Sequence, residues 1–211
     1  MIIDCISDLH GYYPKLDGGD LLIVAGDLAE NDREISYVEF MDWFYAQPYE
    51  RKILIAGNHD NFIAKFGFNM FENSTYLCDS GTEFKGVKIW GSPWTKSFFG
   101  MNRHCKAFTV GSDDELKEKW DLIPMDTNIL VTHCPPWGIL DRIPKENLGS
   151  ISLANLVFDP KRMCILKLHV FGHIHEWGGQ MVDAVKLNFV NASIMDENYD
   201  PVYKPVRIIY E

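Results

Sequence analysis

Short, mostly apolar runs recur along the chain, and each ends at a glycine or a polar residue. The runs cover residues 1–7, 21–25, 53–56, 128–132 and 168–171. Such runs, without regularly spaced polar positions, are typical of strands that are buried on both faces of a sheet. Open α/β sheets form their active sites from residues at the carboxyl ends of these strands. The pattern therefore predicts an α/β fold with a candidate site at the strand ends.

Apolar residues at helical spacing predict amphipathic helices between these runs. In residues 33–46 the apolar positions are Ile35, Val38, Met41, Trp43 and Phe44. Asp32 stands near the start of this segment, where its side chain is a suitable N-cap. We expect further helices over residues 113–120, with Ser112 as the N-cap, and over residues 151–158.

The middle and the end of the chain have a different pattern. Residues 75–94 contain β-prone segments with glycines at positions 81, 86 and 91, which predicts short strands joined by tight turns. Residues 137–150 are typical of a polar loop, whereas residues 186–190 and 206–210 are typical of strands. Because no internal repeat or linker interrupts the chain, we expect a single domain over residues 1–211.

Composition and charge narrow the class of protein. The 211 residues are 46% apolar, which allows a sizeable core, and no apolar run reaches the length of a membrane span. No secretory signal is recognisable, and the five cysteines are scattered, which fits reduced thiols in the cytoplasm. The net charge of −10 opposes binding to nucleic acid, so an anionic substrate requires a local positive charge at the site.

Side chains that bind metal ions follow the predicted strands. They are Asp8, His10, Asp27, Asn58, His59, His133, His173 and His175. Five of the seven histidines of the chain follow a strand in this way. A single histidine near a core is more often a packing residue, but this many coincidences at strand ends indicate a metal site. Oxygen and nitrogen donors of this kind suit Mn, Fe, Zn, Co or Ni.

The number of candidate ligands is too large for one tetrahedral ion. It suits two ions that share a carboxylate at a separation of about 3.5–4 Å, the arrangement used for the hydrolysis of phosphate esters. Two divalent ions beside the carboxylates of Asp8 and Asp27 leave a net charge of about +2. This local charge resolves the conflict between an acidic protein and an anionic substrate.

Taken together, these motifs resemble those of a known family. Asp8-x-His10, Gly26-Asp27, Gly57-Asn58-His59-Asp60, His133 and Gly172-His173-x-His175 are similar, in order, to the five motifs of the calcineurin-like metallophosphoesterases. The resemblance implies a four-layer αββα sandwich of two mixed β-sheets flanked by helices. It also implies a metal-bridging hydroxide that attacks phosphorus in line with the leaving oxygen.

The resemblance assigns a role to each of these residues. It implies that Asp8, His10 and His175 hold one metal ion, that Asn58, His133 and His173 hold the other, and that Asp27 bridges the two. His59 is expected to contact the phosphate and to protonate the leaving group, with Asp60 orienting the ring of His59. We expect manganese as the metal, with the other ions named above as alternatives.

A narrower resemblance points to the metallophosphoesterase-domain-containing (MPPED) branch of this family. The segments that carry it are Gly91-Ser92-Pro93-Trp94, Thr132-His133-Cys134-Pro135-Pro136 followed by Ile139-Leu140-Asp141, Gly172-His173-Ile174-His175-Glu176 and Val190-Asn191-Ala192-Ser193. It implies a phosphodiesterase that acts on cyclic nucleotides or other small phosphodiesters. The alternatives are a phosphomonoesterase or protein phosphatase on the same metal site, and a non-catalytic scaffold that is stabilised by metal.

Several residues near the strand ends are candidates for contact with the substrate. They are Trp94, Phe98, Phe99, His104, Trp137 and Arg142. The aromatic side chains among them are suited to stacking on a nucleobase. Packing of the loops against the core is an equally good interpretation of the same residues. The sequence leaves the oligomeric state open.

Overall fold

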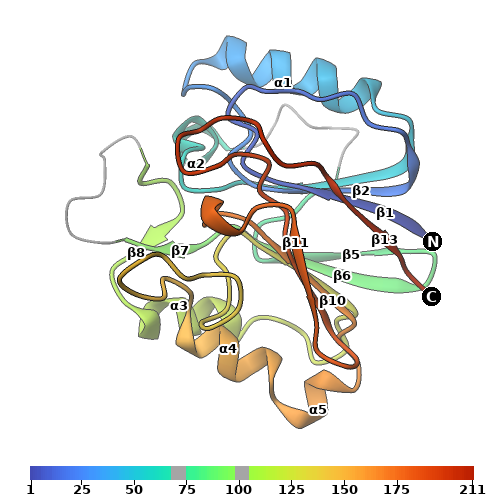
Figure 1. Cartoon of the computed structure of the whole chain (residues 1–211), viewed down its shortest axis with the longest axis vertical. Coiled ribbons are helices and arrows are strands. Elements are labelled where there is room, and N and C mark those ends of the chain that lie inside the picture. Colours follow the sequence, from blue (N-terminus) through green and yellow to red (C-terminus); the bar gives the residue numbers. More distant parts are fainter. Residues whose placement is uncertain (68–74, 98–104) are drawn as a thin grey trace.

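Two β-sheets pack face to face, and helices cover the outer face of each sheet (Figure 1). The computed structural model describes residues 1–67, 75–97 and 105–211. From top to bottom, Figure 1 shows a helical layer, two sheet layers and a second helical layer. The fold class predicted from the sequence, a four-layer sandwich with mixed sheets, is confirmed.

The first sheet has the strand order β13-β1-β2-β3-β4. Its strands are β1 (Ile2–Ile6), β2 (Gly19–Ala25), β3 (Tyr49–Ile55), β4 (Thr75–Tyr76) and β13 (Val206–Ile209). Strands β1 to β4 run parallel to one another, and β13 pairs antiparallel with β1. The carboxyl ends of the parallel strands therefore lie along one edge of the sheet.

The second sheet has the strand order β11-β12-β10-β9-β6-β5. Its strands are β5 (Ser80–Phe84), β6 (Val87–Ser92), β9 (Ile129–Thr132), β10 (Leu168–Phe171), β11 (Gln180–Asp183) and β12 (Asn188–Asn191). The four central strands are parallel, and the two outer strands are antiparallel to their neighbours. A small separate pair consists of β7 (Thr95–Lys96) and β8 (Thr109–Val110).

Three apolar layers hold the sandwich together. Between the sheets, residues such as Ile23 and Ile53 from the first sheet meet Val131 and Val170 from the second. Helix α1 (Glu34–Ala46) covers the other face of the first sheet. The helices on the opposite side are α3 (Asp113–Trp120), α4 (Ile151–Val157) and α5 (Pro160–Met163). Because residues 21–25 of β2 and 53–55 of β3 are buried on both faces, these parts of the strands are apolar throughout.

The predicted helix over residues 33–46 forms, and three of its five apolar positions, Met41, Trp43 and Phe44, pack on the first sheet as expected. Ile35 and Val38 are 54% and 37% exposed, whereas Tyr37, Phe40 and Phe44 pack on the sheet. The aromatic rings fill more of the space above the sheet than the two β-branched side chains, and they set the rotation of the helix.

Asp32 does not cap helix α1, contrary to the expectation. Its carboxylate instead accepts hydrogen bonds from the Phe62 N–H and the Asn61 side chain, at the start of helix α2 (Asn61–Phe66). The Ser112 cap is confirmed, because its hydroxyl accepts the N–H of Glu115 at 3.2 Å.

Two of the three glycines expected at turns lie inside strands. Gly81 belongs to β5 and Gly91 to β6, and Gly86 alone stands in the turn between them, with a φ of +79°. A Cβ at Gly91 would lie 2.4 Å from the Cβ of Leu77, so this glycine allows the close approach of two segments. Strand β11 was not predicted, because all four of its residues are exposed and give no apolar pattern.

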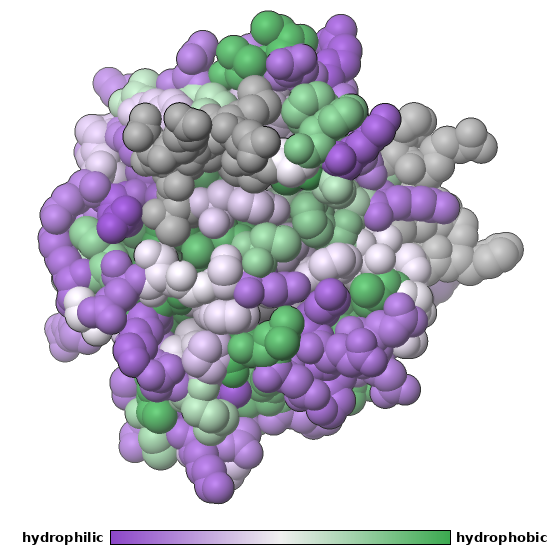
Figure 2. All heavy atoms as spheres, turned by 180° about the vertical axis from the view of Figure 1, so that it is seen from behind, coloured by the Kyte–Doolittle hydropathy of each residue, from purple (hydrophilic) through white to green (hydrophobic). Residues whose placement is uncertain are grey.

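The surface is mainly hydrophilic on the face that Figure 2 shows. Among the described residues on this face, apolar side chains lie in several groups that are separated by hydrophilic ones. Within the described ranges, no helix combines the length and the apolar character needed to cross a membrane.

Candidate metal centre

The carboxyl ends of five parallel strands meet at one place. Strands β1, β2 and β3 of the first sheet and β9 and β10 of the second are followed by candidate ligands. Asp8, His10, Asp27 and His173 have φ angles of +54°, +42°, +53° and +70°. Because non-glycine residues rarely adopt this left-handed conformation, strained backbone is concentrated where the strands turn to present these side chains.

One cluster is formed by Asp8, His10 and His175, whose ligand atoms lie within 4.8 Å of one another. The Nε2 atom of His175 is 3.3 Å from Oδ1 of Asp8, and its Nδ1–H donates to the Asp196 carbonyl at 3.0 Å. The Nε2 atom of His10 is buried and has no hydrogen-bond partner among the described residues. An orphaned buried nitrogen that faces two other ligand groups fits a metal ion.

A second cluster surrounds His133. Its Nδ1–H donates to the Ala25 carbonyl at 2.8 Å, which leaves Nε2 free to face the site. Nε2 lies 3.0 Å from Oδ1 of Asn58 and 3.3 Å from Oδ2 of Asp27. The ring of His173 lies beside that of His133, with the ring centroids 5.1 Å apart. These side chains form a second group of oxygen and nitrogen donors.

Asp27 lies between the two clusters. Its Oδ2 atom is 3.8 Å from Nε2 of His10 and 3.3 Å from Nε2 of His133. A carboxylate oxygen of Asp27 lies within 4.8 Å of ligand atoms of both Asp8 and His133. Asp27 also forms a second group of this kind with His10 and His59. This position is the one that a carboxylate shared by two ions requires.

Three glycines make room for these ligands. A Cβ at Gly57 would lie 2.3 Å from Oδ1 of Asp27, and a Cβ at Gly26 would lie 2.5 Å from Nδ1 of His133. A Cβ at Gly172 would lie 2.1 Å from Oδ2 of Asp8. Each glycine is therefore required by the close packing of backbone against a candidate ligand, which explains why glycine precedes so many of them.

Burial and charge shift the pKa values of the cluster. Burial lowers the pKa of His10 to about 4 and that of His173 to about 3, so both rings are neutral near pH 7. Burial also opposes the charged form of His133, but the Asp27 carboxylate outweighs it and raises the His133 pKa to about 9. The charge of the His133 ring holds the pKa of Asp27 well below its usual value, against the effect of burial. Metal binding must displace the proton of His133.

His59 and Asp60 have separate surroundings. The His59 N–H donates to Oδ1 of Asp27 at 2.9 Å, and its ring lies edge-on to His10, with 4.7 Å between the centroids. Its Nδ1 atom lies 3.7 Å from Sγ of Cys105. Within the described chain, the Asp60 carboxylate accepts hydrogen bonds from backbone N–H groups and from the Tyr37 hydroxyl. The expected contact between Asp60 and the His59 ring is not among them.

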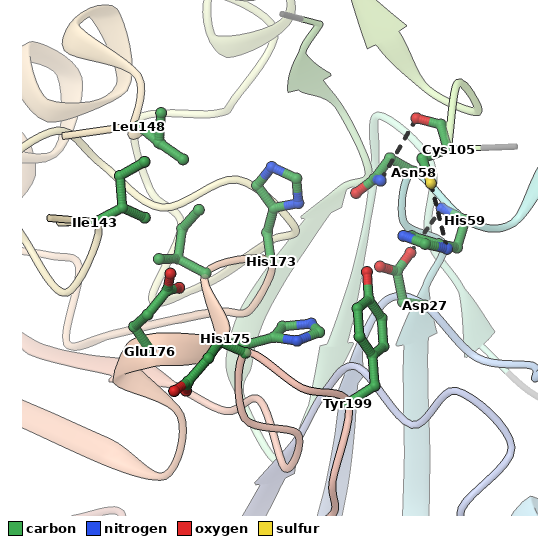
Figure 3. A pocket seen from close by; sticks show the side chains of 12 residues that line it. Asp27, Asn58, His59, Cys105, Ile143, Leu148, His173, His175, Glu176 and Tyr199 are labelled. Carbon is green, nitrogen blue, oxygen red and sulfur yellow. Dashed lines mark hydrogen bonds between the residues drawn. The ribbon is translucent and has the colours of Figure 1, made fainter. Parts of the chain in front are cut away.

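The candidate centre opens into a pocket of about 630 Å³, which Figure 3 shows from close by. Described residues that line it are Asp27, Asn58, His59, Cys105, Ile143, Leu148, His173, Ile174, His175, Glu176, Glu197 and Tyr199. The sequence reasoning missed Cys105, Ile143, Leu148, Glu197 and Tyr199 as pocket residues. They come from loops without a motif, and no pattern in the sequence singles them out.

Six residues were expected as candidates for contact with the substrate. Trp94, Trp137 and Arg142 do not line the pocket. Trp94 packs instead on the outer apolar layer, with its N–H donating to Asp79 at 2.8 Å and the Lys119 ammonium 4.0 Å from the ring centroid. Phe98, Phe99 and His104 lie outside the described residues.

Asn191 holds the backbone of the segment that carries two candidate ligands. Its Nδ2 donates to the Ile174 carbonyl at 2.8 Å and its Oδ1 accepts the Ser193 N–H at 3.1 Å. Ile174 stands between His173 and His175, so this amide fixes the backbone that carries two candidate ligands.

Known proteins resemble this chain in sequence and in fold. The sequence profile of the calcineurin-like phosphoesterase family matches residues 1–177. Metallophosphoesterase domain-containing protein 1 of Homo sapiens is 38% identical, over 97% of this chain and 69% of the human protein. This likeness supports the relation to the branch expected from the sequence motifs.

Two solved structures share the architecture at low sequence identity. The protein TT1561 of Thermus thermophilus has a TM-score of 0.57 at 15% identity, over 90% of this chain and 88% of that one. The phosphopantetheinyl hydrolase of Mycobacterium tuberculosis has a TM-score of 0.54 at 15% identity, over 99% of this chain and 96% of that one. At this level of identity, the match establishes a common fold.

Proposed function

Because the chain belongs to the calcineurin-like phosphoesterase family, we propose that it is a two-metal phosphodiesterase that acts on small substrates. The observation that carries the proposal is the convergence of the donors of Asp8, His10, Asp27, Asn58, His133, His173 and His175 at the ends of five strands. Bound divalent cations would supply an activated water and neutralise the charge of the phosphoryl oxygens. Manganese suits this set of oxygen and nitrogen donors, and two ions fit the two clusters around Asp27.

His59 is the proposed proton donor to the leaving oxygen. Its backbone N–H is fixed by Asp27, and its ring lines the pocket beside His10. Because Nδ1 faces Cys105, we assign the proton transfer to Nε2. A positioned acid of this kind contributes about 10²- to 10⁴-fold to turnover.

The charges of the pocket support a diester rather than a monoester as the substrate. The described lining residues include Glu176 and Glu197 but no lysine or arginine. A phosphodiester carries one negative charge, whereas a monoester near pH 7 carries almost two. The second charge of the monoester would lie near carboxylates without a cationic side chain to balance it, which raises its cost of binding.

The test compares two substrates with the metal-loaded protein. We expect bis(p-nitrophenyl) phosphate to be hydrolysed with a higher kcat/KM than p-nitrophenyl phosphate, in the presence of Mn²⁺. Removal of metal by a chelator should abolish both activities. A higher kcat/KM for the monoester would favour the phosphomonoesterase, and full occupancy by metal without any hydrolysis would favour the scaffold.

The His59→Asn variant tests the proposed acid separately. It should bind metal like the wild type but lose about 10²-fold or more of kcat on a diester with a poor leaving group. The loss should be smaller for a nitrophenol leaving group, which needs less protonation. An equal loss for both leaving groups would remove His59 from the proton transfer.

A further inference from the structure

Tyr199 occupies a position in the pocket that none of the family motifs includes. Its ring lies edge-on to His10 and to His175, with 4.9 Å between the centroids in each case, and 6.2 Å from the ring of His59. In Figure 3 its hydroxyl end points across the pocket toward Asp27. The side chain therefore reaches the space between the candidate metal ligands and the proposed acid.

The loop that carries Tyr199 is built around Asp196. Oδ1 of Asp196 accepts the N–H groups of Asn198 at 2.8 Å and Asp200 at 2.9 Å, and its carbonyl accepts the N–H of Tyr199 at 3.0 Å. The same carbonyl accepts Nδ1–H of His175 at 3.0 Å. One residue thus fixes both a candidate ligand and the loop that presents the tyrosine.

The backbone of Tyr199 is in the left-handed region, with a φ of +65°. An aromatic residue adopts this conformation only where its surroundings enforce it. The hydrogen bonds of the Asp196 loop supply that constraint, and they hold the ring over the pocket.

The hydroxyl of Tyr199 differs in its hydrogen bonding from the hydroxyls of three tyrosines that pack at the core. The hydroxyls of Tyr13, Tyr37 and Tyr49 donate to the Leu28 carbonyl, Asp60 and Asp4. The Tyr199 hydroxyl has no hydrogen-bond partner within the described ranges, and the residue is 51% exposed. It is held in place, yet its donor remains available to a ligand in the pocket.

We propose that the Tyr199 hydroxyl donates a hydrogen bond to a non-bridging oxygen of the phosphate group of the substrate. The inference rests on the proposed function, which places that phosphate beside Asp27. A neutral donor suits a pocket whose described lining contains no lysine or arginine. It binds the phosphoryl oxygen without adding a charge, so it serves a monoanionic diester well.

The test uses the metal-loaded protein and two readouts, binding of inorganic phosphate by calorimetry and kcat/KM on bis(p-nitrophenyl) phosphate. Tyr199→Phe removes only the oxygen, and we expect both quantities to fall about 10- to 100-fold, with metal content and Tm unchanged. Tyr12→Phe is the matched control, since Tyr12 is 47% exposed and lines a different pocket. It should match the wild type in both readouts.

Phosphate affinity of Tyr199→Phe within twofold of the wild type would overturn the inference. Tyr199→Leu separates the ring from the hydroxyl. If only this variant is impaired, the ring packs against the histidines and the proposed hydrogen bond is wrong. Phosphate binding also separates this inference from the proposed function, because a wild type that binds phosphate but hydrolyses no ester would contradict the function alone.

Discussion

The carboxylate of Asp60 accepts the backbone N–H of Asp27 at 3.0 Å and so joins the turn after β3 to the turn after β2. The same oxygen accepts the Gly57 N–H at 2.7 Å, and the other accepts the Leu28 N–H at 3.1 Å and the Tyr37 hydroxyl at 3.2 Å. All four partners are donors. Asp60 therefore acts as a positioning residue for the bridging candidate Asp27.

Asp60→Asn is expected to destabilise the protein and to weaken metal binding. The amide would direct an N–H₂ group at two of the four donors, which leaves buried groups unpaired at a cost of about 1–3 kcal/mol. Asp27 would lose its fixed backbone, so the Mn²⁺ concentration needed for half occupancy should rise. Chemical denaturation and a metal titration measure the two effects.

Tyr37→Phe is the control for this substitution, because it removes one donor and leaves the three backbone contacts of Asp60 in place. It should retain wild-type metal affinity. If Asp60→Asn also bound Mn²⁺ as tightly as the wild type, the carboxylate would have no role in positioning Asp27.

The strand ends could be predicted from the sequence because the central strands are buried on both faces where they approach the site. An apolar run that stops at Gly26, Gly57 or Gly172 marks both the strand and the point where the backbone turns. The candidate ligands follow from the same signal, since Asp27, Asn58 and His173 come directly after these glycines.

The remaining features depend on contacts between distant segments. Nothing near Tyr199 in the sequence indicates that the Asp196 carbonyl meets His175 and brings the loop over the pocket. The exposure of Ile35 and Val38 on α1 was also missed, because both are as apolar as the residues that do face the sheet. Only the fit of Phe40 and its neighbours to the underlying strands decides the rotation of that helix.

Gly57→Ala is expected to disrupt the metal centre. The new methyl group would lie 2.3 Å from Oδ1 of Asp27 and 2.7 Å from Nε2 of His133, so one of these side chains must move. The φ of Gly57 is not in the left-handed region, so the effect comes from the contact rather than from backbone strain. Added Mn²⁺ should raise the Tm of the wild type more than that of the variant.

Gly111→Ala provides the matched glycine. Its methyl group would meet only the end of the Glu115 side chain, at 3.2 Å, and neither residue lines the pocket. It should show the full Mn²⁺-dependent rise in Tm. A full rise in Gly57→Ala as well would mean that the two candidate ligands tolerate displacement.

Glu176→Gln and Glu197→Gln should each reduce the preference for diesters. Removing one carboxylate from the wall of the pocket lowers the repulsion of a dianionic monoester more than that of a monoanionic diester. We expect kcat/KM for the monoester to rise about two- to fivefold relative to the diester, mainly through KM. The gain should shrink at high ionic strength, because salt screens the same repulsion in the wild type.

The buried ring of His169 makes the stability of the fold depend on pH. Its Nε2 lies 2.9 Å from the Thr132 hydroxyl, which itself donates to the Cys134 carbonyl, so Nε2–H is the donor to Thr132. Burial lowers the His169 pKa to about 3, whereas the unfolded chain has a pKa of about 6.5. The unfolded state therefore binds a proton first as the pH falls.

It follows that His169 supports the folded state fully above about pH 6.5 and loses this contribution as the pH falls toward about 3. In that range, one proton changes the free energy of unfolding by about 1.4 kcal/mol per pH unit. His169→Gln keeps an N–H donor near Thr132 but does not titrate. Denaturant unfolding measures the free energy of unfolding of both proteins. The value for the wild type minus that for the variant should fall with this slope from about pH 6 to about pH 4, as expected for about one proton. Parallel curves for the two proteins would show that His169 becomes protonated without cost in the folded state.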